Sequence, residues 1–284
     1  MGYRSIFRPD AFRDQVVIVT GAGSGIGRCT AHELAALGAQ VVLVGRTREK
    51  LDQVESEIRE DGGQASVQVC DIRDEAAVAA AVDRVVADHG RIDGLVNNAG
   101  GQFQSPLRDI SMRGFEAVVR SNLVGGFNVM RETFNRWMAN NGGSIVNITM
   151  DAWHGLPLYG HSGAARSGMN SLTETAAAEW ASAGVRVNAV APGVIASSGF
   201  DTYPEEAWAR IRTMADKIPL GRFGQESEVS AAIVFLLSPA AAFITGTCVR
   251  VDGGAPNARQ TLELRRPQRT SPFQGFHRAK ATRQ

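Results

Sequence analysis

Four side chains that could take part in proton transfer or hydrogen bonding stand within eight residues of the stretch GLPLYGHSGAARSGMNSLTE (155–174): Tyr159, His161, Ser162 and Arg166. A tyrosine hydroxyl can give or take a proton at a carbonyl or hydroxyl oxygen, and a serine hydroxyl can donate a hydrogen bond to it. A guanidinium stays charged, so Arg166 can supply hydrogen bonds and positive charge but cannot be a general acid. The stretch predicts either an altered catalytic helix or an ordinary helix start with Ser162 as its N-cap.

A glycine-rich turn, TGAGSGIG (20–27), follows the apolar run QVVIVT and precedes a helical pattern. Glycine lets the backbone turn sharply and approach a pyrophosphate, which then lies at the helix N-terminus. The alternative is a plain tight turn. Its place between a strand and a helix, at the start of a βαβ chain, favours a dinucleotide site.

The end of the second predicted strand indicates which dinucleotide binds. The sequence from Val44 to Arg48 reads VGRTR and contains no carboxylate. An acidic residue there would bind the ribose 2′-hydroxyl of NAD, whereas an arginine pairs with the 2′-phosphate of NADP. We therefore expect NADP as cofactor with Arg46 on its 2′-phosphate; the alternative is that Arg46 and Arg48 are solvated charges at a helix start.

Strand-like apolar runs alternate with helical stretches along most of the chain, which indicates a parallel sheet covered by helices on both faces. The expected fold class is α/β, a Rossmann-type doubly wound parallel sheet in a single domain. We expect an N-terminal arm (1–13), an NADP-binding domain (14–256) with a substrate loop at about 196–224, and a basic C-terminal extension (257–284). Six cations oppose one Glu between residues 261 and 284. This suggests a flexible tail that meets substrate phosphates and matters little for folding.

Composition excludes several function classes. The 284 residues are 44% hydrophobic and 21% charged with a net charge of +1, so neither nucleic acid nor an anionic surface is expected as the main partner. No apolar run is long enough to span a membrane, and the first residues lack the apolar core of a signal peptide, so we expect no membrane partner and a cytoplasmic location. Cys29, Cys70 and Cys248 are far apart and suggest no metal site.

Over residues 14–254 these motifs together resemble the short-chain dehydrogenase/reductase family. TGAGSGIG fits the family's TGxxxGxG, NNAG (97–100) fits its adenine-side strand motif, and APGVI (191–195) fits the PG motif after its sixth strand. The resemblance implies that Asp71 contacts the adenine and that the backbone at 191–195 holds the nicotinamide carboxamide, with Ser197 in place of the usual Thr. The full set of expected cofactor contacts is Gly21, Ser24, Gly25, Ile26, Gly27, Arg46, Asp71, Asn98, Ala99, Gly100, Arg166, Pro192, Gly193, Ile195 and Ser197.

The family's catalytic residues are a Ser followed by Tyr-x-x-x-Lys, and all three are changed here. Alignment through RSGMNSLT places Arg166 at the Lys, Ser162 at the Tyr and Met150 at the Ser. Asn122 matches the family's active-site helix Asn. We expect the catalytic set to be Asn122, Tyr159, Ser162 and Arg166.

A Ser in place of the Tyr resembles the 2,4-dienoyl-CoA and trans-2-enoyl-CoA reductases, which reduce a C=C bond. HSGAAR (161–166), GGQFQSP (100–106) and LSPAAAFITG (237–246) are similar to peroxisomal trans-2-enoyl-CoA reductases. In conjugate reduction the negative charge develops on the thioester oxygen, where hydrogen-bond donors stabilise it. A Tyr–Lys acid pair is then dispensable. The resemblance implies an acyl-CoA substrate and a homo-oligomer.

Each assignment has an alternative. Asn122 could organise water or brace a helix, and Arg166 could form a structural ion pair instead of binding the ribose. Tyr159 could be an oxyanion donor, a proton source or the wall of an acyl pocket. We expect His161 to be packed and not to act as an acid. The alternative functions are a carbonyl reductase or 3-hydroxyacyl-CoA dehydrogenase that uses Tyr159, and a catalytically weak NADP-binding sensor or oligomer subunit.

Overall fold

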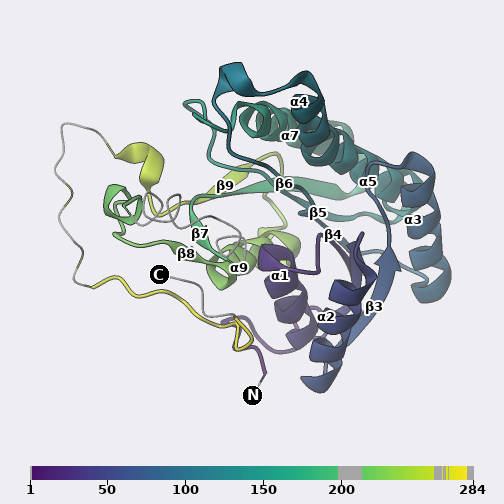
Figure 1. The fold of residues 1–284 in the computed structure, drawn as a ribbon. Coiled ribbons are helices and arrows are strands. Elements are labelled where there is room, and N and C mark those ends of the chain that lie inside the picture. Colours follow the sequence, from purple (N-terminus) through teal and green to yellow (C-terminus); the bar gives the residue numbers. More distant parts are fainter. Residues whose placement is uncertain (1, 198–212, 259–263, 265–266, 268, 280–284) are drawn as a thin grey trace.

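The computed structural model describes residues 2–197, 213–258, 264, 267 and 269–279 (Figure 1). Its main feature is a seven-stranded sheet in the order β3-β2-β1-β4-β5-β6-β9, in which every neighbouring pair is parallel. The strands are β1 (Val16–Thr20), β2 (Gln40–Gly45), β3 (Gln64–Val69), β4 (Gly94–Asn97), β5 (Gly143–Ile148), β6 (Val185–Pro192) and β9 (Cys248–Val251). The expected doubly wound α/β fold is confirmed.

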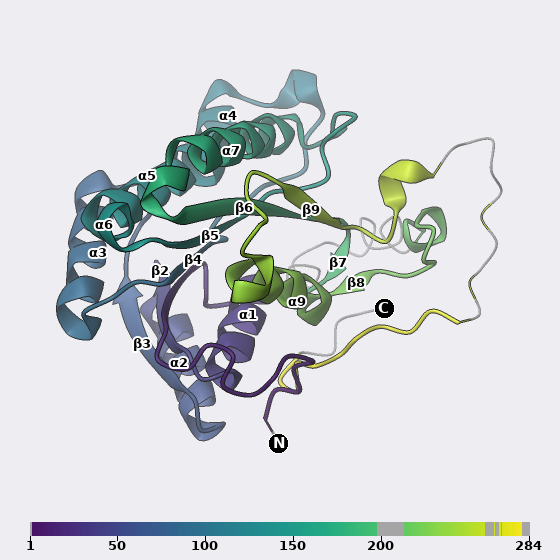
Figure 2. The same cartoon turned by 180° about the vertical axis from the view of Figure 1, so that it is seen from behind.

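Helices cover both faces of the sheet, as Figures 1 and 2 show from opposite sides. One layer holds α1 (Gly25–Ala36), α2 (Arg48–Glu60) and α9 (Glu226–Leu237). The other layer holds α3 (Glu75–His89), α4 (Met112–Val119), α5 (Gly125–Thr133) and α7 (Gly160–Glu179). A π-helical turn, η2 (Arg120–Val124), joins α4 to α5, and η3 (Phe134–Met138) and α6 (Ala139–Asn141) continue from α5.

The alternation of side chains along each strand produces two cores. In β1, Val17 and Val19 pack with the α1, α2 and α9 layer, whereas Val16 and Ile18 pack with the opposite layer. All four are at most 5% exposed. Burial on both faces explains the near-continuous run of β-branched residues in this strand.

The sheet reverses its strand order between β1 and β4. β1 pairs with β2 on one side and with β4 on the other, and Val17 lies opposite both Val41 and Gly94. The segments that follow these strands, from Gly21 and from Asn98, therefore diverge and leave a crevice. Open α/β sheets bind their ligands at this point.

The expected substrate loop (about 196–224) falls partly on residues 198–212, which lie outside the described residues. Its two ends meet in a short parallel ladder, β7 (Ile195–Ala196) and β8 (Gly224–Gln225). Ile218 and Phe223 are buried against Ala196. The ladder thus fixes the segment that follows β6 to the start of α9.

The expectation that the C-terminal extension is a free tail is wrong for its described part. Phe276 is 1% exposed and packs with Tyr3 and Cys29. Arg278 pairs with Glu60 and Asp61 at the end of α2. The net charge of the extension gave no sign of these contacts, because they depend on one aromatic ring and on acidic partners far away in the sequence.

Within the described residues, no helix combines the length and the apolar character needed to cross a membrane.

Candidate functional site

At several positions of the turn between β1 and α1, only glycine fits the backbone conformation or the space available. Gly21 and Gly25 have φ values of +66° and +58°, in the left-handed region. A Cβ on Gly27 would overlap the Gly21 carbonyl oxygen. Ser24, with an extended backbone, is the N-cap of α1, and its side chain caps none of the described N–H groups of this helix. The open helix N-terminus and the close backbone approach fit a phosphate group.

Thr20 and Asn98 lock this turn to the end of β4. The Thr20 hydroxyl accepts hydrogen bonds from the backbone N–H groups of Asn98 and Ala99, both at 2.9 Å. The Asn98 side-chain amide donates to the Thr20 carbonyl oxygen at 2.9 Å. Thr20 was not among the predicted site residues. The side chain of Asn98, a predicted cofactor contact, holds the turn itself.

A cleft of about 180 Å³ lies beside this turn and is lined by Gly21, Ser24, Arg46, Thr47, Lys50, Asp71, Arg73, Ala99 and Gly100, among others. Within the described residues Arg46 forms no ion pair. Arg48 instead binds Asp52 one turn further along α2, at 2.9 Å. Lys50, a second cation of the cleft, was missed from the sequence. The cleft therefore places the cations of Arg46 and Lys50 beside the glycine-rich turn, where an anionic group could bind.

Asp71 lies in the cleft but its carboxylate already has a partner. Arg73 binds it through two nitrogens, with contacts of 2.6–3.1 Å, and also through its backbone N–H. These hydrogen bonds lower the pKa of Asp71 to about 2. Arg73, two residues away, was not predicted as part of the site.

The residues expected at the nicotinamide end follow β6. Pro192 ends this strand, and the Gly193 N–H donates to the Val251 carbonyl oxygen at 3.0 Å. A Cβ on Gly193 would lie only 2.8 Å from the Asp252 Cα. Ile195 is buried in β7, and Ser197 is the last described residue before the segment 198–212.

Ile26, a further predicted cofactor contact, lies in α1 and packs against the hydrophobic core.

Arg166 projects from α7 toward the carboxyl end of β5. Its Nη1 donates to the Ile148 carbonyl oxygen at 2.6 Å, and a Cβ on Gly100 would overlap its Nη2. Burial lowers the pKa of this guanidinium to about 10. The alternative of a structural ion pair finds no support among the described residues, because none of their carboxylates pairs with Arg166. A desolvated cation of this kind suits an anionic group or ribose hydroxyls.

Asn122 lies in η2, a π-helical turn of the sort often found at functional sites. It is 2% exposed, and both ends of its amide bind the backbone of Gly101: Nδ2 donates to the carbonyl oxygen at 2.8 Å and Oδ1 accepts from the N–H at 2.9 Å. Asn122 therefore fixes the loop that touches Arg166. Its catalytic contribution stays a prediction.

Ser162 and His161 are fully buried at the start of α7. The Ser162 Oγ and the His161 Nε2 have no hydrogen-bond partner among the described residues. The His161 Nδ1 accepts from the Ser162 N–H at 2.8 Å, and the Phe103 ring packs edge-on against the imidazole with centroids 4.4 Å apart. The expectation that His161 is packed is confirmed. Tyr159, not Ser162, is the N-cap of α7, so the N-cap alternative for Ser162 is wrong.

Tyr159 is half-buried and its carbonyl oxygen accepts from the Gly163 N–H at 2.9 Å. Its catalytic role stays a prediction. Asp151, in the loop after β5, is also half-buried, and burial together with Asp252 raises its pKa. Among the described residues, no group of three or more His, Cys, Asp or Glu side chains could hold a metal ion.

The chain is similar to known oxidoreductases over most of its length. The family model for enoyl-(acyl carrier protein) reductase matches residues 21–256. Peroxisomal 2,4-dienoyl-CoA reductase of Danio rerio is 36% identical over 89% of this chain and 85% of its own. The 3-oxoacyl-[acyl-carrier-protein] reductase FabG of Thermotoga maritima is 36% identical over 84% of this chain and 97% of its own.

Solved structures agree with this assignment. The citronellol catabolism dehydrogenase AtuB of Pseudomonas aeruginosa PAO1 is 60% identical, with a TM-score of 0.81, over 89% of this chain and 99% of the other. The glycine-rich turn, the crevice and the matches together show that the chain is an oxidoreductase of the short-chain dehydrogenase/reductase family.

Proposed function

We propose that this enzyme uses NADPH to reduce the C=C bond of a 2-enoyl-CoA. The observation that carries the proposal is the state of α7, which has Ser162 and the buried guanidinium of Arg166 where the family has its Tyr and Lys, with no carboxylate of the described residues paired to that guanidinium. Such a site offers hydrogen-bond donors and positive charge but lacks the family's proton-donating pair. The similarity to a 2,4-dienoyl-CoA reductase supports the same chemistry.

The side chains can be assigned roles from their surroundings. When bound, NADPH would supply a hydride to the β-carbon of the enoyl group. Arg166 would bind the nicotinamide ribose and contribute positive charge as the thioester oxygen becomes negative, with Ser162 on the same face of α7 as a further donor. Asn122 would hold the Gly100–Gly101 backbone against Arg166. Protonation of the α-carbon does not need a Tyr–Lys pair, because water can supply that proton.

The choice of NADPH follows from the cleft beside the glycine-rich turn. Arg46 and Lys50 line this cleft. Asp71 lines it as well, but Arg73 neutralises the carboxylate of Asp71. A 2′-phosphate would meet cations there, whereas the 2′-hydroxyl of NAD would find no acidic acceptor at the end of β2.

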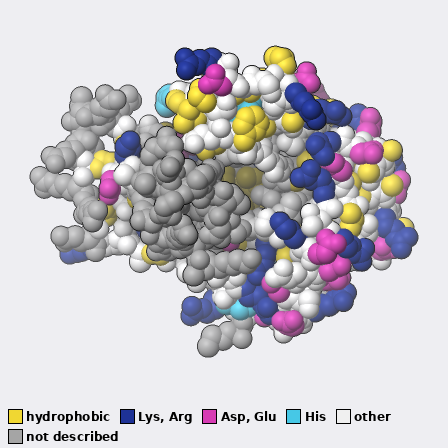
Figure 3. All heavy atoms as spheres, in the orientation of Figure 1, with side chains coloured by type: hydrophobic (Ala, Val, Ile, Leu, Met, Phe, Trp, Pro, Cys, Tyr) yellow, Lys and Arg dark blue, Asp and Glu magenta, His cyan; other side chains and the backbone are white. Residues whose placement is uncertain are grey.

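An acyl chain has apolar surface next to this site. Hydrophobic side chains gather over α4 and α7 in the space-filling view (Figure 3). The exposed large hydrophobic residues in and just before these helices are Phe103, Leu107, Met112, Trp153 and Leu158. The loops that carry them are joined by a hydrogen bond from the Ser105 N–H to the Leu158 carbonyl oxygen. We propose that this rim contacts the acyl-CoA, and that the enzyme is a cytoplasmic homo-oligomer.

The second candidate is a carbonyl reductase or 3-hydroxyacyl-CoA dehydrogenase. It is favoured by the position of Tyr159 directly before α7 and by the similarity to a relative named for reducing a 3-oxoacyl group. Tyr159 would then be the acid.

A substrate panel separates the candidates. We expect NADPH oxidation with crotonyl-CoA and with a 2,4-dienoyl-CoA, and little with acetoacetyl-CoA. Turnover of acetoacetyl-CoA alone, abolished by Tyr159→Phe, would establish the second candidate. Tight NADPH binding without turnover of any of the three would indicate the sensor or subunit function.

A further inference from the structure

The C-terminal segment, residues 269–279, begins beside Leu220, passes the start of α9 and reaches α1 and the N-terminal arm (Figures 1 and 2). Its far end is held by Phe276, whose ring is 1% exposed. The ring centroid lies 4.9 Å from the His32 centroid and 4.9 Å from the Arg28 Cζ. Burial lowers the pKa of His32 to about 4, so at neutral pH this contact is between two uncharged rings.

Polar contacts fix the same end to α1 and α2. Arg278 binds Asp61 through two nitrogens, each at 3.0 Å, and its carbonyl oxygen accepts from the Arg28 Nη1 at 3.1 Å. The Arg28 Nε donates to Glu57 at 2.8 Å. Arg28, only three residues after Gly25, is therefore held from two sides.

The near end of the segment is tied to the start of α9. The Phe273 N–H donates to Glu228, and the Phe273 carbonyl oxygen accepts from the Ser227 hydroxyl at 2.6 Å. Gln274 donates to the Gln225 side chain at 3.3 Å. Gln225 belongs to β8, which pairs with β7 directly after the Pro192–Gly193 turn.

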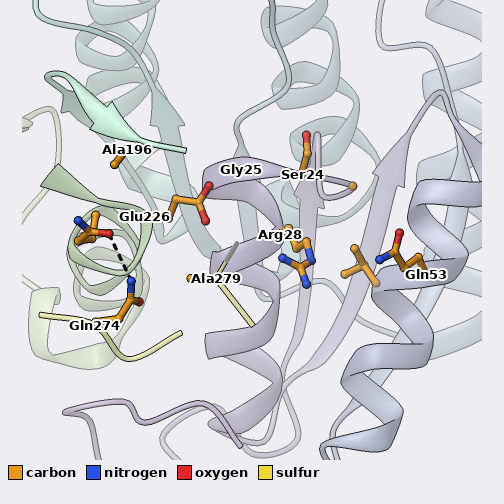
Figure 4. A pocket seen from close by; sticks show the side chains of 11 residues that line it. Ser24, Gly25, Arg28, Gln53, Ala196, Glu226, Gln274 and Ala279 are labelled. Carbon is orange, nitrogen blue, oxygen red and sulfur yellow. Dashed lines mark hydrogen bonds between the residues drawn. The ribbon is translucent and has the colours of Figure 1, made fainter. Parts of the chain in front are cut away.

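A small cavity of about 50 Å³ lies where these parts meet. Figure 4 shows Ser24, Gly25 and Arg28 from the first turn of α1, Ala196 and Glu226 from the β7–β8 side, and Gln274 and Ala279 from the C-terminal segment. One short segment thus contacts both the phosphate-binding turn and the ladder at the nicotinamide end.

We propose that the C-terminal segment positions the dinucleotide site, with Phe276 and Arg278 holding Arg28 and the first turn of α1 against the β7–β8 ladder. The backbone N–H groups of this turn bind phosphate only within a narrow range of distance and angle, so losing the segment weakens the cofactor's phosphate contacts. The inference rests on the dinucleotide site of the proposed function but not on which bond is reduced.

Titration of full-length variants with NADPH, followed by its fluorescence, tests this inference without any turnover. We expect Phe276→Ala and Arg278→Ala each to raise the NADPH Kd about tenfold, a change of about 1.4 kcal/mol. Phe276→Leu and Arg278→Lys should recover most of the affinity. Arg84→Ala, which removes an exposed ion pair on α3, is the surface control.

A core control separates positioning from a general loss of stability. Val82→Ala lowers stability from the opposite layer, where Val82 is 3% exposed. Suppose that Phe276→Ala, Arg278→Ala and Val82→Ala lower Tm equally and leave the NADPH Kd within about twofold of wild type. The C-terminal segment then only stabilises the fold, and the inference is wrong. Should Phe276→Ala fail to fold, the NADPH Kd values of Arg278→Ala and Arg278→Lys still test the inference. A failure to reduce any C=C bond would leave these Kd values unaffected.

Discussion

The two sides of the β1–β4 crevice differ in how their polar groups are satisfied. On the glycine-rich side, Thr20 and Asn98 bind each other's segments, and Asp71 is neutralised by Arg73. On the α7 side, within the part of the chain that the structure describes, Ser162 and His161 keep buried polar atoms without partners, and no carboxylate pairs with the buried charge of Arg166. On the first side these bonds brace the backbone of the turn, whereas on the second side buried polar atoms lack a partner among the described residues.

A substitution in the glycine-rich turn is expected to have the largest effect. Gly27→Ala places a Cβ against the Gly21 carbonyl oxygen and the Asn98 amide, so the turn must shift. We expect NADPH affinity to fall by about a thousandfold or more, which corresponds to about 4.1 kcal/mol. Calorimetric titration measures this. Ala36→Gly at the other end of α1 is a control, and an unchanged affinity for Gly27→Ala would show that the turn does not carry the phosphates.

The next effect concerns the cation of the unsatisfied side. Arg166→Ala removes the guanidinium beside Gly100, and we expect kcat to fall by about 10²–10³, the scale of losing one oxyanion donor. Arg166→Lys keeps the charge and should retain partial activity. Steady-state kinetics at saturating NADPH would contradict the assignment if both variants kept wild-type kcat.

Ser162→Ala removes a hydroxyl that has no hydrogen-bond partner among the residues that the structure describes. Deleting an unsatisfied buried group costs no hydrogen bond, so Tm should stay equal or rise while kcat falls by about 10²–10³. Asn122→Ala is the contrast, since it breaks two hydrogen bonds to Gly101 and should lower both Tm and kcat. Unchanged kcat in Ser162→Ala would leave the serine a packing residue.

The smallest effect tests cofactor choice. Arg46→Ala should weaken NADPH by about 1.5–3 kcal/mol and leave NADH almost unchanged, because only NADPH has the 2′-phosphate that a guanidinium can bind. Arg48→Ala is the matched control, since Arg48 binds Asp52 on the surface of α2. Equal losses for the two cofactors would reduce Arg46 to a surface charge.

Sequence reasoning was most successful where local pattern determines structure. Strand-like apolar runs that alternate with helical stretches predicted the parallel sheet, and the glycine positions predicted the turn. Both features depend on residues that are adjacent in the chain. It failed for Phe276, which is buried by Tyr3 and α1 far away in sequence. It also missed Thr20, Lys50 and Arg73, whose roles depend on which way a side chain points. The π-helical turn around Asn122 left no signal in the spacing of apolar residues.

A competition experiment shows directly whether this site delivers hydride to a carbon of a C=C bond. Equal concentrations of crotonyl-CoA and acetoacetyl-CoA are offered with NADPH that carries deuterium at the transferable position, and the products are read by mass spectrometry and NMR. We expect butyryl-CoA with deuterium at its β-carbon. Deuterated 3-hydroxybutyryl-CoA as the dominant product would show that the site reduces the carbonyl group instead.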